Sequence, residues 1–523
     1  MGREVTRRHL LGRAGTAAAG TAAAGLAGVG VAGCWSHSPG SGMAGSTATG
    51  GGTVVDGYRR FVTRPDLNPP VLRVASRQAG SQARYYFMNA PYSGPGRGGA
   101  IIADARGDLV WMGPDAPGAH RIEFNVQSYR GEPVLTWFEG VETHGWGQGV
   151  AVIADSAYHR RHVIRAHSGP HDRSKLNVDH HEFNITADGH ALVSAFRTYY
   201  DVDLRPVGGP SKGVLVAGVC QEIDIATGKL IFEWDSLQDG VPLDETRQPF
   251  HYKGQQFGIA SNPYDYFHIN SIAPTPDGDL LISSRNTWSV YKVRKLGTHD
   301  SKIVWRMNGK NSDFTMGPGT SYFWQHHVRP HPGGIVTVFD NGAAPPKEPR
   351  SRALVLHVDE DAMHVTLGHQ YVRPGQPLLA DAMGSAQLLP NGNMLAGWGT
   401  NPYFSEFTPD GTLITAGQMT NGNPSYRTFA SPWTGHPAGP PDVAARHRAG
   451  GATVYASWNG ATELASWAVL TGKSPSSLVK TDSARKRGFE TAIEVRSSGP
   501  YFAVQAHDAS GSMLARSATV RIR

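Results

Sequence analysis

Short apolar runs separated by turn residues recur along the chain from Tyr58 to Tyr426. The clearest runs each follow a pair of turn residues: Asp188-Gly189 before HALVS, Asp277-Gly278 before DLLIS, Gly333-Gly334 before IVTVF and Asn391-Gly392 before NMLAG. Gly and Asn tolerate the positive φ that a tight hairpin requires. Because no segment in this range shows the periodicity of a long amphipathic helix, the pattern predicts an all-β fold.

A second apolar run follows several of these hairpins, as in EIDIATGKLIFEW and HDSKIVWRM. An inner and an outer hairpin together make a unit of about four strands, which is typical of a propeller blade when it is repeated. The turns at Gly189, Gly278, Gly333 and Asn391 are 89, 55 and 58 residues apart. This uneven spacing predicts a β-propeller of about six blades without fixing the number. A β-sandwich with long loops is the alternative interpretation.

The segments outside this pattern suggest a domain order. Residues 35–57 are rich in Ser, Gly and Thr and predict a flexible linker, and residues 431–451 are rich in Pro and Gly and predict a second one,. Residues 58–430 form the predicted propeller. Residues 452–523 contain the short runs TVYASWNG, ELASWAVLTG, ETAIEVR and YFAVQAHDASG, which are typical of a fibronectin- or immunoglobulin-like β-sandwich,. We expect this module to brace the propeller without chemistry of its own.

Residues 1–34 predict export. Arg7-Arg8 precedes an Ala/Gly-rich run, which fits a twin-arginine signal, and the run ends in Val31-Ala32-Gly33-Cys34, which resembles a lipobox,. Lipidated Cys34 would hold the protein on the outer face of the cell membrane; without the lipid the protein would be secreted. The only other cysteine is Cys220, so a lipidated Cys34 leaves no intramolecular disulfide, and we expect Cys220 in a buried strand,.

Composition and charge narrow the possible partners. The 64 Gly and 35 Pro are spread among the apolar runs and supply the turns that many short strands require,. The formal net charge is +6 at pH 7, and about half of it comes from arginines before Cys34, so nothing indicates a nucleic-acid partner. No other apolar run approaches the roughly 18 residues of a membrane span, so we expect membrane contact only through the lipid. The sequence predicts no particular oligomeric state.

Three histidines occupy equivalent positions in the repeated pattern. His181, His268 and His326 each lie seven to nine residues before a turn, and Arg285 ends the strand that follows the second of these turns. Equivalent positions on successive blades face the same central channel, so these groups are predicted to converge. Taken singly, each histidine is more often a surface residue or a structural core residue. Asp381 stands in the comparable region of the fourth motif.

The predicted cluster suits a sulfate ester. A forked guanidinium beside imidazoles matches a tetrahedral oxyanion such as sulfate. Asn270 lies two residues beyond His268 and so on the same strand face, while Tyr266 and Trp324 could supply an aromatic wall for a flat donor or acceptor,. These three are the candidate substrate-binding residues. A neutral imidazole is also a competent nucleophile for a sulfuryl or phosphoryl group.

Five blocks of the sequence carry a resemblance to a known family. HHEFNITADGHALVSAFRT, DYFHINSI, DGDLLISSRNT, WRMNGKNSDF and FWQHHVRPHPGGIVTVFDN resemble the bacterial arylsulfotransferases that need no PAPS, in the branch common among actinobacteria and fungi. The resemblance spans roughly residues 60–430. It implies a six-bladed propeller and a ping-pong exchange without a cofactor. An aryl sulfate ester donates its sulfuryl group to a histidine, and a phenolic acceptor then takes it.

The resemblance also implies roles for the candidate residues. His326 would be the sulfurylated nucleophile. His181 and His268 would bind sulfuryl oxygens and move the phenolic proton, and Asn270 and Arg285 would hold the sulfate oxygens. Two doublets leave the choice open, because His180 is an alternative to His181 and His327 is an alternative to His326.

Two other functional classes fit parts of the pattern. Clustered imidazoles also bind copper, zinc or iron in metalloenzymes and redox proteins. Against a metal, Arg285 would repel a cation, and no Asp or Glu is in register beside the three histidines, so no metal site is predicted. A noncatalytic surface protein that binds sulfated or glycan ligands is the remaining alternative.

Overall fold

The computed structural model describes residues 51–522 except 77–79, 82, 91–98, 114–117, 170–174, 253, 376 and 498. The predicted export signal, the lipidation site Cys34 and most of the linker 35–57 lie outside the described residues. Within the described ranges there are 39 strands and three short 3-10 helices, so the all-β prediction is confirmed. No helix in these ranges is long and apolar enough to cross a membrane.

Six antiparallel sheets, numbered 1 to 6 along the chain, hold most of residues 72–431. Sheet 1 contains β31 (Phe429–Ser431), β4 (Tyr85–Ala90), β5 (Gly99–Asp104) and β6 (Leu109–Met112). Sheet 2 contains β7 (His120–Tyr129), β8 (Glu132–Thr143), β9 (Trp146–Ala154) and β10 (Arg160–Ile164). Sheet 3 contains β11 (Phe183–Ile185), β12 (His190–Val202), β13 (Gly213–Asp224) and β14 (Leu230–Asp235), with β17 (Tyr264–Asp265) parallel to β13.

The next three sheets repeat this order of strands. Sheet 4 contains β18 (Ile269–Pro274), β19 (Leu280–Ser284), β20 (Ser289–Gly297) and β21 (Asp300–Met307). Sheet 5 contains β23 (His326–His331), β24 (Ile335–Asp340), β25 (Arg352–Asp359) and β26 (His364–Tyr371), with β22 (Thr315–Met316) at the outer edge. Sheet 6 contains β27 (Ser385–Leu388), β28 (Met394–Gly397), β29 (Tyr403–Phe407), β30 (Leu413–Met419) and β3 (Leu72–Ser76).

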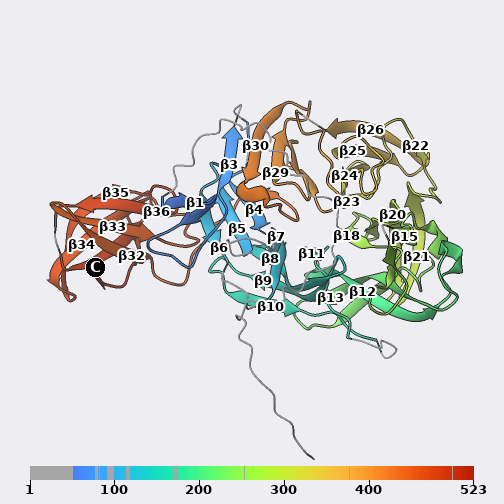
Figure 1. Cartoon of the computed structure of the whole chain (residues 1–523), viewed down its shortest axis with the longest axis horizontal. Helices are drawn as coiled ribbons and strands as arrows, with labels where there is room; N and C mark the ends of the chain where they lie inside the picture. The colour runs from blue at the N-terminus through green and yellow to red at the C-terminus, as the bar shows by residue number, and fades with distance from the viewer. Residues whose placement is uncertain are drawn as a thin grey trace, which may run out of the picture.

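The six sheets follow one another around a ring (Figure 1). The first strands of neighbouring sheets touch, as β7 touches β11, β11 touches β18, β18 touches β23 and β23 touches β27. We call these the inner strands; β31 is the inner strand of sheet 1. The ring is closed by both ends of the chain, because β31 pairs with β4 and β3 pairs with β30.

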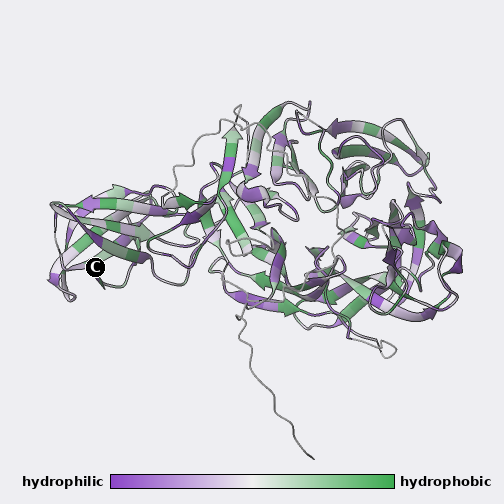
Figure 2. Ribbon diagram, viewed as in Figure 1, coloured by the Kyte–Doolittle hydropathy of each residue, from purple (hydrophilic) through white to green (hydrophobic). Residues whose placement is uncertain are grey.

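Apolar side chains fill the space between adjacent sheets. One core cluster joins Leu192 and Trp234 of sheet 3 to Ile272 and Tyr291 of sheet 4. Every residue of β19 is buried, as expected for a strand in a sheet that is packed on both faces,. Figure 2 shows hydrophobic stretches in many strands of the ring. Cys220 lies fully buried in β13, as predicted.

The predicted turns form as expected. Gly278 and Gly392 have φ of 87° and 85°, the left-handed region that a side chain disfavours,. Three 3-10 helices, η1 (Arg205–Val207), η2 (Leu243–Glu245) and η3 (Thr420–Gly422), and the two small sheets of β1 (Thr53–Val55) with β2 (Tyr58–Arg60) and β15 (His251–Tyr252) with β16 (Gln255–Gln256) complete the part of the chain before residue 432.

The C-terminal residues form a two-sheet sandwich, drawn in orange-red beside the ring in Figure 1. One sheet contains β32 (Asp442–Arg448), β33 (Gly451–Ser457) and β36 (Glu490–Val495). The other contains β35 (Ser477–Arg485), β34 (Ser466–Ser474), β37 (Tyr501–His507), β38 (Met513–Arg516) and β39 (Val520–Arg521). Residues of both sheets share one apolar core. Strand β32 lies inside the segment 431–451 that the sequence assigned to a linker, because alternating residues of a polar strand gave no strong apolar signal.

Hydrogen bonds join the sandwich to the ring and to the segment that follows β2. Glu490 accepts from the backbone N–H and the hydroxyl of Thr63 at 2.7 and 2.6 Å. Asn459 exchanges two hydrogen bonds with the backbone of Met112 in sheet 1, both at 3.0 Å. These contacts are consistent with the bracing role expected for the module.

Candidate active site

The inner strands of sheets 3, 4 and 5 begin beside three histidines. His181 precedes β11 by two residues, His268 directly precedes β18, and His326 is the first residue of β23. The ring centroid of His181 lies 4.8 Å from that of His268 and 6.5 Å from that of His326. The structure therefore brings the three imidazoles, which we call the histidine cluster, to one end of the inner strands.

The structure distinguishes the members of the two histidine doublets. His180 stacks on His181 at 4.2 Å and also contacts Tyr426, but no contact joins it to His268 or His326 among the described residues. His327 lies against Phe429 and accepts a hydrogen bond from the backbone N–H of Ala386 at 3.2 Å. His181 and His326 are therefore the members that face the cluster.

The hydrogen bonds of His326 define its tautomer. Its Nδ1 lies 2.8 Å from Asn341 Oδ1 and 3.1 Å from the carbonyl oxygen of Trp324, and both oxygens only accept hydrogen bonds. The amide orientation of Asn341 is determined in turn, since its Nδ2 donates to the carbonyls of Ala380 and Met383,. Nδ1 of His326 therefore carries the proton, and Nε2 keeps a lone pair.

The lone pair of His326 is available at neutral pH. Burial lowers the pKa of this imidazole well below its ordinary value, and the positive charge of Arg285 lowers the pKa further,. The one hydrogen bond to Nε2 comes from the backbone N–H of Met383 at 3.3 Å, a long and therefore weak contact,. A neutral imidazole with its Nε2 free to react is the form that a nucleophile requires.

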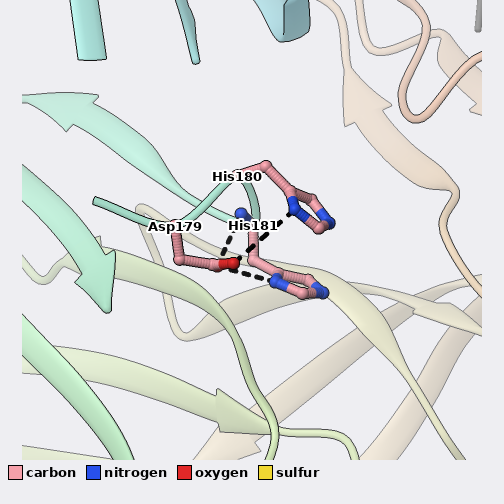
Figure 3. A group of neighbouring side chains, drawn as sticks. All are labelled: Asp179, His180 and His181. Carbon is pink, nitrogen blue, oxygen red and sulfur yellow. Dashed lines mark hydrogen bonds and ion pairs between the residues drawn. The ribbon is translucent and has the colours of Figure 1, made fainter. Parts of the chain in front are cut away.

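An aspartate orients His181 (Figure 3). Nδ1 of His181 lies 2.7 Å from Asp179 Oδ2, which also accepts from the backbone N–H of His181 and the hydroxyl of Ser194. Burial lowers the pKa of His181 to about 3, although the carboxylate acts in the opposite direction. Burial alone would raise the pKa of Asp179, but its hydrogen bonds and the two imidazoles lower it overall. At neutral pH, Asp179 is ionised and Nε2 of His181 is a proton acceptor.

A second aspartate holds His268 in the same way. Asp265 Oδ2 lies 2.5 Å from Nδ1 of His268, and its Oδ1 accepts from the backbone N–H of His268 at 2.9 Å. His268 has φ of 53°, so this bond pattern stabilises a backbone conformation that is uncommon for histidine,. Two Asp-His pairs therefore flank His326.

The two aspartates correct one prediction from the sequence. No acidic residue was expected in register beside the histidines, whereas Asp179 and Asp265 form ion-pair contacts with His181 and His268. The spacings Asp-x-His and Asp-x-x-His were visible in DHHEF and DYFHIN. They were missed because the two spacings differ, so that no single register contains both carboxylates.

Asp179, His180 and His181 also offer atoms that lie within 4.8 Å of one another, a spacing that could hold a metal ion. In Figure 3 the atoms that would be ligands are already directed at one another. Oδ1 of Asp179 accepts from the backbone N–H of Gly147, and its Oδ2 accepts from Nδ1 of His181. These hydrogen bonds explain why Asp179, His180 and His181 lie so close together: the carboxylate of Asp179 positions the imidazole of His181.

Arg285 adds a cation to the cluster. Its guanidinium lies 4.8 Å from the ring centroid of Trp324 and donates to Asn286 Oδ1 at 2.9 Å and to the carbonyl oxygen of Asp381 at 3.1 Å. Burial lowers the pKa of Arg285 to about 10, with Asp265 and Asp381 acting in the opposite direction. Arg285 is therefore cationic at neutral pH. Asp381 contributes its backbone carbonyl here.

The three residues predicted to bind substrate differ in their placement. Trp324 contacts Arg285 and donates its indole N–H to the carbonyl of Pro345 at 3.0 Å. Asn270 is fully buried, and its amide donates to the carbonyl of Gln325, the residue before His326. The structure does not bring Tyr266 to the cluster, because its ring is fully buried in the apolar core between sheets 3 and 4.

The chain matches one protein-family model, described as Arylsulfotransferase (ASST), over residues 125–420. This range covers more than half of the chain. The chain belongs to the arylsulfotransferase family. The match identifies the family without a branch, and it includes all members of the histidine cluster and Arg285. A search of curated proteins found no match.

Several solved structures are distantly similar to this arylsulfotransferase family member. A protein of unknown function from Bacteroides caccae is 11% identical with a TM-score of 0.39 over 66% of this chain and 98% of that chain. The periplasmic gluconolactonase PpgL of Pseudomonas aeruginosa is 12% identical with a TM-score of 0.35 over 66% and 99%. A catalytically inactive virginiamycin B lyase from Staphylococcus aureus with quinupristin is 9% identical with a TM-score of 0.30 over 74% and 92%.

A buried ion-pair network joins the strands that carry the cluster of this arylsulfotransferase family member. Arg427 lies 2.5 Å from Glu123 and 3.4 Å from Glu182, and Arg329 lies 2.9 Å from Glu182. Arg427 also donates to the backbone carbonyl of Asn270 at 2.9 Å. Removing one partner of such a buried pair typically costs about 3–5 kcal/mol. The network therefore fixes the inner strands relative to one another.

The members of the histidine cluster and Arg285 differ in burial. His326 and His181 are 1% and 3% exposed, whereas His268 and Arg285 are half-buried. Two cavities, of about 420 and 200 Å³, lie elsewhere: one borders residues 435–440 and the C-terminal sandwich, and the other borders residues 330–336. Neither cavity is lined by a cluster histidine.

Replacing Asp179 by asparagine is expected to lower kcat by about 10² to 10⁴-fold, as for other histidines that lose an orienting carboxylate. The amide removes the charge that stabilises a protonated His181 and permits the wrong tautomer. The measurement is steady-state transfer from p-nitrophenyl sulfate to phenol. KM for the donor is expected to stay constant, because Asp179 contacts the imidazole of His181 at Nδ1 and not at Nε2. Asp155→Asn, in the turn between β9 and β10, is the matched control. A wild-type kcat in Asp179→Asn would show that His181 needs no such partner.

Proposed function

We propose that the chain is an arylsulfotransferase that moves a sulfuryl group from an aryl sulfate ester to a phenol through a sulfurylated His326. The observation that carries the proposal is the lone pair on Nε2 of neutral His326, beside two Asp-held imidazoles and the guanidinium of Arg285. Membership of the arylsulfotransferase family supports it. The reaction needs no cofactor.

The first half-reaction transfers the sulfuryl group to the protein. Nε2 of His326 attacks the donor sulfur, so that an S–N bond forms while the S–O bond to the aryl group breaks. The electron pair of that bond leaves with the phenoxide. Arg285 offers two parallel N–H groups to the sulfuryl oxygens. The imidazole of His268, held by Asp265, lies beside that of His181 at the same end of the inner strands. Each well-placed donor of this kind lowers the barrier by roughly 3 kcal/mol.

The second half-reaction returns His326 to its starting state. Nε2 of His181 takes the proton of the phenolic acceptor, and the ionised Asp179 stabilises the imidazolium that forms. The phenolic oxygen attacks sulfur while the S–N bond breaks, and the electron pair returns to His326. The proton on His181 passes to water or to the departed phenoxide, which completes the balance.

The remaining candidate residues act around this centre. Asn270 holds the carbonyl of Gln325 and so positions the backbone that carries His326. Trp324 forms a wall against Arg285 and limits where the donor ring can lie. The donor and the phenolic acceptor are the expected partners.

The fold and location belong to the same proposal. The ring of six sheets, each with four or five strands, supports a six-bladed propeller, and the two facing C-terminal sheets support a fibronectin- or immunoglobulin-like module,. The Arg7-Arg8 pair and the segment ending in Cys34 support export by the twin-arginine route,. The protein would then be lipid-anchored on the outer face of the cell membrane, or secreted.

The decisive test separates the two half-reactions. Purified protein incubated with p-nitrophenyl sulfate alone is expected to release one equivalent of p-nitrophenol and to gain the mass of one sulfuryl group on His326. Added phenol should then remove that mass and form phenyl sulfate. Intact-mass spectrometry and peptide mapping measure the adduct. Turnover without an adduct would indicate direct transfer, and binding of the donor without any release of p-nitrophenol would indicate a noncatalytic binder.

A further inference from the structure

Two cations that the reaction does not use lie against a tryptophan beside the histidine cluster. The guanidinium of Arg247 lies 5.1 Å from the ring centroid of Trp288, and the ammonium of Lys347 lies 5.4 Å from the same centroid. Trp288 packs edge-on against Trp324 at 5.1 Å and against Phe323 at 5.0 Å. The guanidinium of Arg285 lies over the ring of Trp324. The contact between Trp288 and Trp324 therefore connects Arg247 and Lys347 to the candidate active site.

Hydrogen bonds hold the two backbone segments that carry these cations close to Trp288. The N–H of Arg247 donates to the carbonyl of Asn286 at 2.6 Å, which holds the segment after η2 to the turn that carries Arg285 and Trp288. The loop before Lys347 is held next to Trp324, because Trp324 donates its indole N–H to the carbonyl of Pro345. The two cations therefore approach Trp288 from separate loops.

Neither cation is balanced by an acid in the part of the chain that the structure describes. Neither Arg247 nor Lys347 forms an ion pair with a described residue, and the side chain of Lys347 is exposed. Arg247 is half-buried, and its Nε has no hydrogen-bond partner. Burial lowers the pKa of Arg247, with no nearby carboxylate opposing the shift. In addition, the indole N–H of Trp288, a residue that is only 8% exposed, has no partner.

Such an arrangement is unfavourable for folding alone. A half-buried cation without a counter-charge loses hydration that no protein group replaces, and like charges that share one aromatic ring repel each other. Proteins retain such unfavourable arrangements of charge at sites that bind ligands. Aromatic rings bordered by unpaired cations suit a ligand that is flat and carries a negative charge away from its ring.

We infer that Trp288, Phe323, Arg247 and Lys347 form a subsite for the aryl group of the substrate, and that this subsite selects phenols and aryl sulfates bearing a carboxylate. The inference rests on the proposed function. The phenolic end of the substrate lies at His326 and Arg285, the ring lies along Trp288, and the carboxylate reaches Arg247 and Lys347. Because donor and acceptor use the same site in turn, both share the preference.

The test compares carboxylates with their neutral amides. The probes are para-hydroxybenzoate, para-hydroxyphenylacetate and para-hydroxyphenylpropanoate, each beside its primary amide, with the full chain. Calorimetry measures binding to the wild type, and transfer from p-nitrophenyl sulfate gives kcat/KM for each acceptor. The three probes differ in the length of the side chain between the ring and the carboxylate. For one of these lengths we expect the carboxylate to bind more tightly than its amide, and to react with a higher kcat/KM, by about tenfold, which is the effect of one charge-assisted hydrogen bond.

Variants assign the preference to the two cations. Arg247→Gln is expected to reduce the ratio between carboxylate and amide to about one, and Lys347→Gln to reduce it in part. Lys302→Gln removes an exposed charge from the outer strand β21 and should retain the full ratio, which controls for general electrostatics. High salt should weaken the preference of the wild type.

The inference is overturned if the wild type does not distinguish any carboxylate from its amide, or if the preference survives in the double variant Arg247→Gln/Lys347→Gln. Binding by calorimetry needs no turnover. A protein that binds the carboxylates selectively but transfers nothing would therefore contradict the proposed sulfuryl transfer while supporting the subsite. Transfer without selectivity would contradict the subsite alone.

Discussion

His326→Ala is expected to abolish sulfuryl transfer, lowering kcat/KM by at least about 10⁴-fold. In the proposed mechanism the imidazole takes the sulfuryl group from the donor through Nε2, while Asn341 holds its Nδ1, and alanine removes both nitrogens. A methyl group also leaves Asn341 Oδ1 without its donor, but this amide is still held by two backbone carbonyls. Release of p-nitrophenol with and without phenol measures the loss.

The matched control is the other member of the doublet. His327→Ala removes an imidazole that faces Phe429 and Ala386, so transfer should fall only as far as local packing is disturbed. Thermal unfolding of both variants shows how much of any loss is structural. An active His326→Ala with an inactive His327→Ala would mean that the two histidines had been assigned in the wrong order.

Arg285→Lys is expected to lower kcat by about 10² to 10³-fold, the effect of removing one oriented donor from an anionic transition state. An ammonium cannot offer two parallel N–H bonds to two sulfuryl oxygens, and it loses the stacking of the planar guanidinium on Trp324,. Positive charge is kept, so the comparison isolates geometry. Steady-state kinetics and the rate of adduct formation with donor alone are the measurements.

Arg160→Lys provides the control for this substitution. Arg160 also lies over a tryptophan, at 5.9 Å from the ring of Trp137, but it lies on the outer strand β10 and pairs with Glu139. The same chemical change there should leave transfer at the wild-type rate. Equal rates in Arg285→Lys and the wild type would remove Arg285 from the proposed role.

The parts of the site that depend on local pattern could be predicted from the sequence. The turns at Gly278 and Gly392 follow from residue type. The three histidines follow from their position seven to nine residues before the turns at Asp188, Asp277 and Gly333. The choice within each doublet could not be made, because it depends on backbone conformation at the start of the inner strand. His327 has φ of 51° and His268 has φ of 53°, and such left-handed residues leave no signal in the sequence,.

The residues that hold the imidazoles in place could be identified only from the folded structure. Asn341 lies fifteen residues after His326 and reaches it only because β23 and β24 pair with His326 opposite Phe339. The network of Arg427, Glu123 and Glu182 joins positions that the sequence separates by hundreds of residues. Tyr266 shows the converse: an aromatic residue close in sequence to His268 is directed into the core between two sheets instead.

The closure of the ring by β31 has a consequence for how the enzyme is made. Tyr426 and Arg427 contact His180, His181 and Glu182, and they are followed at once by the strand that completes sheet 1. A chain that ends before Tyr426 lacks these contacts as well as the strand that completes sheet 1. We therefore expect a product truncated there to carry every cluster histidine and yet to show no transfer.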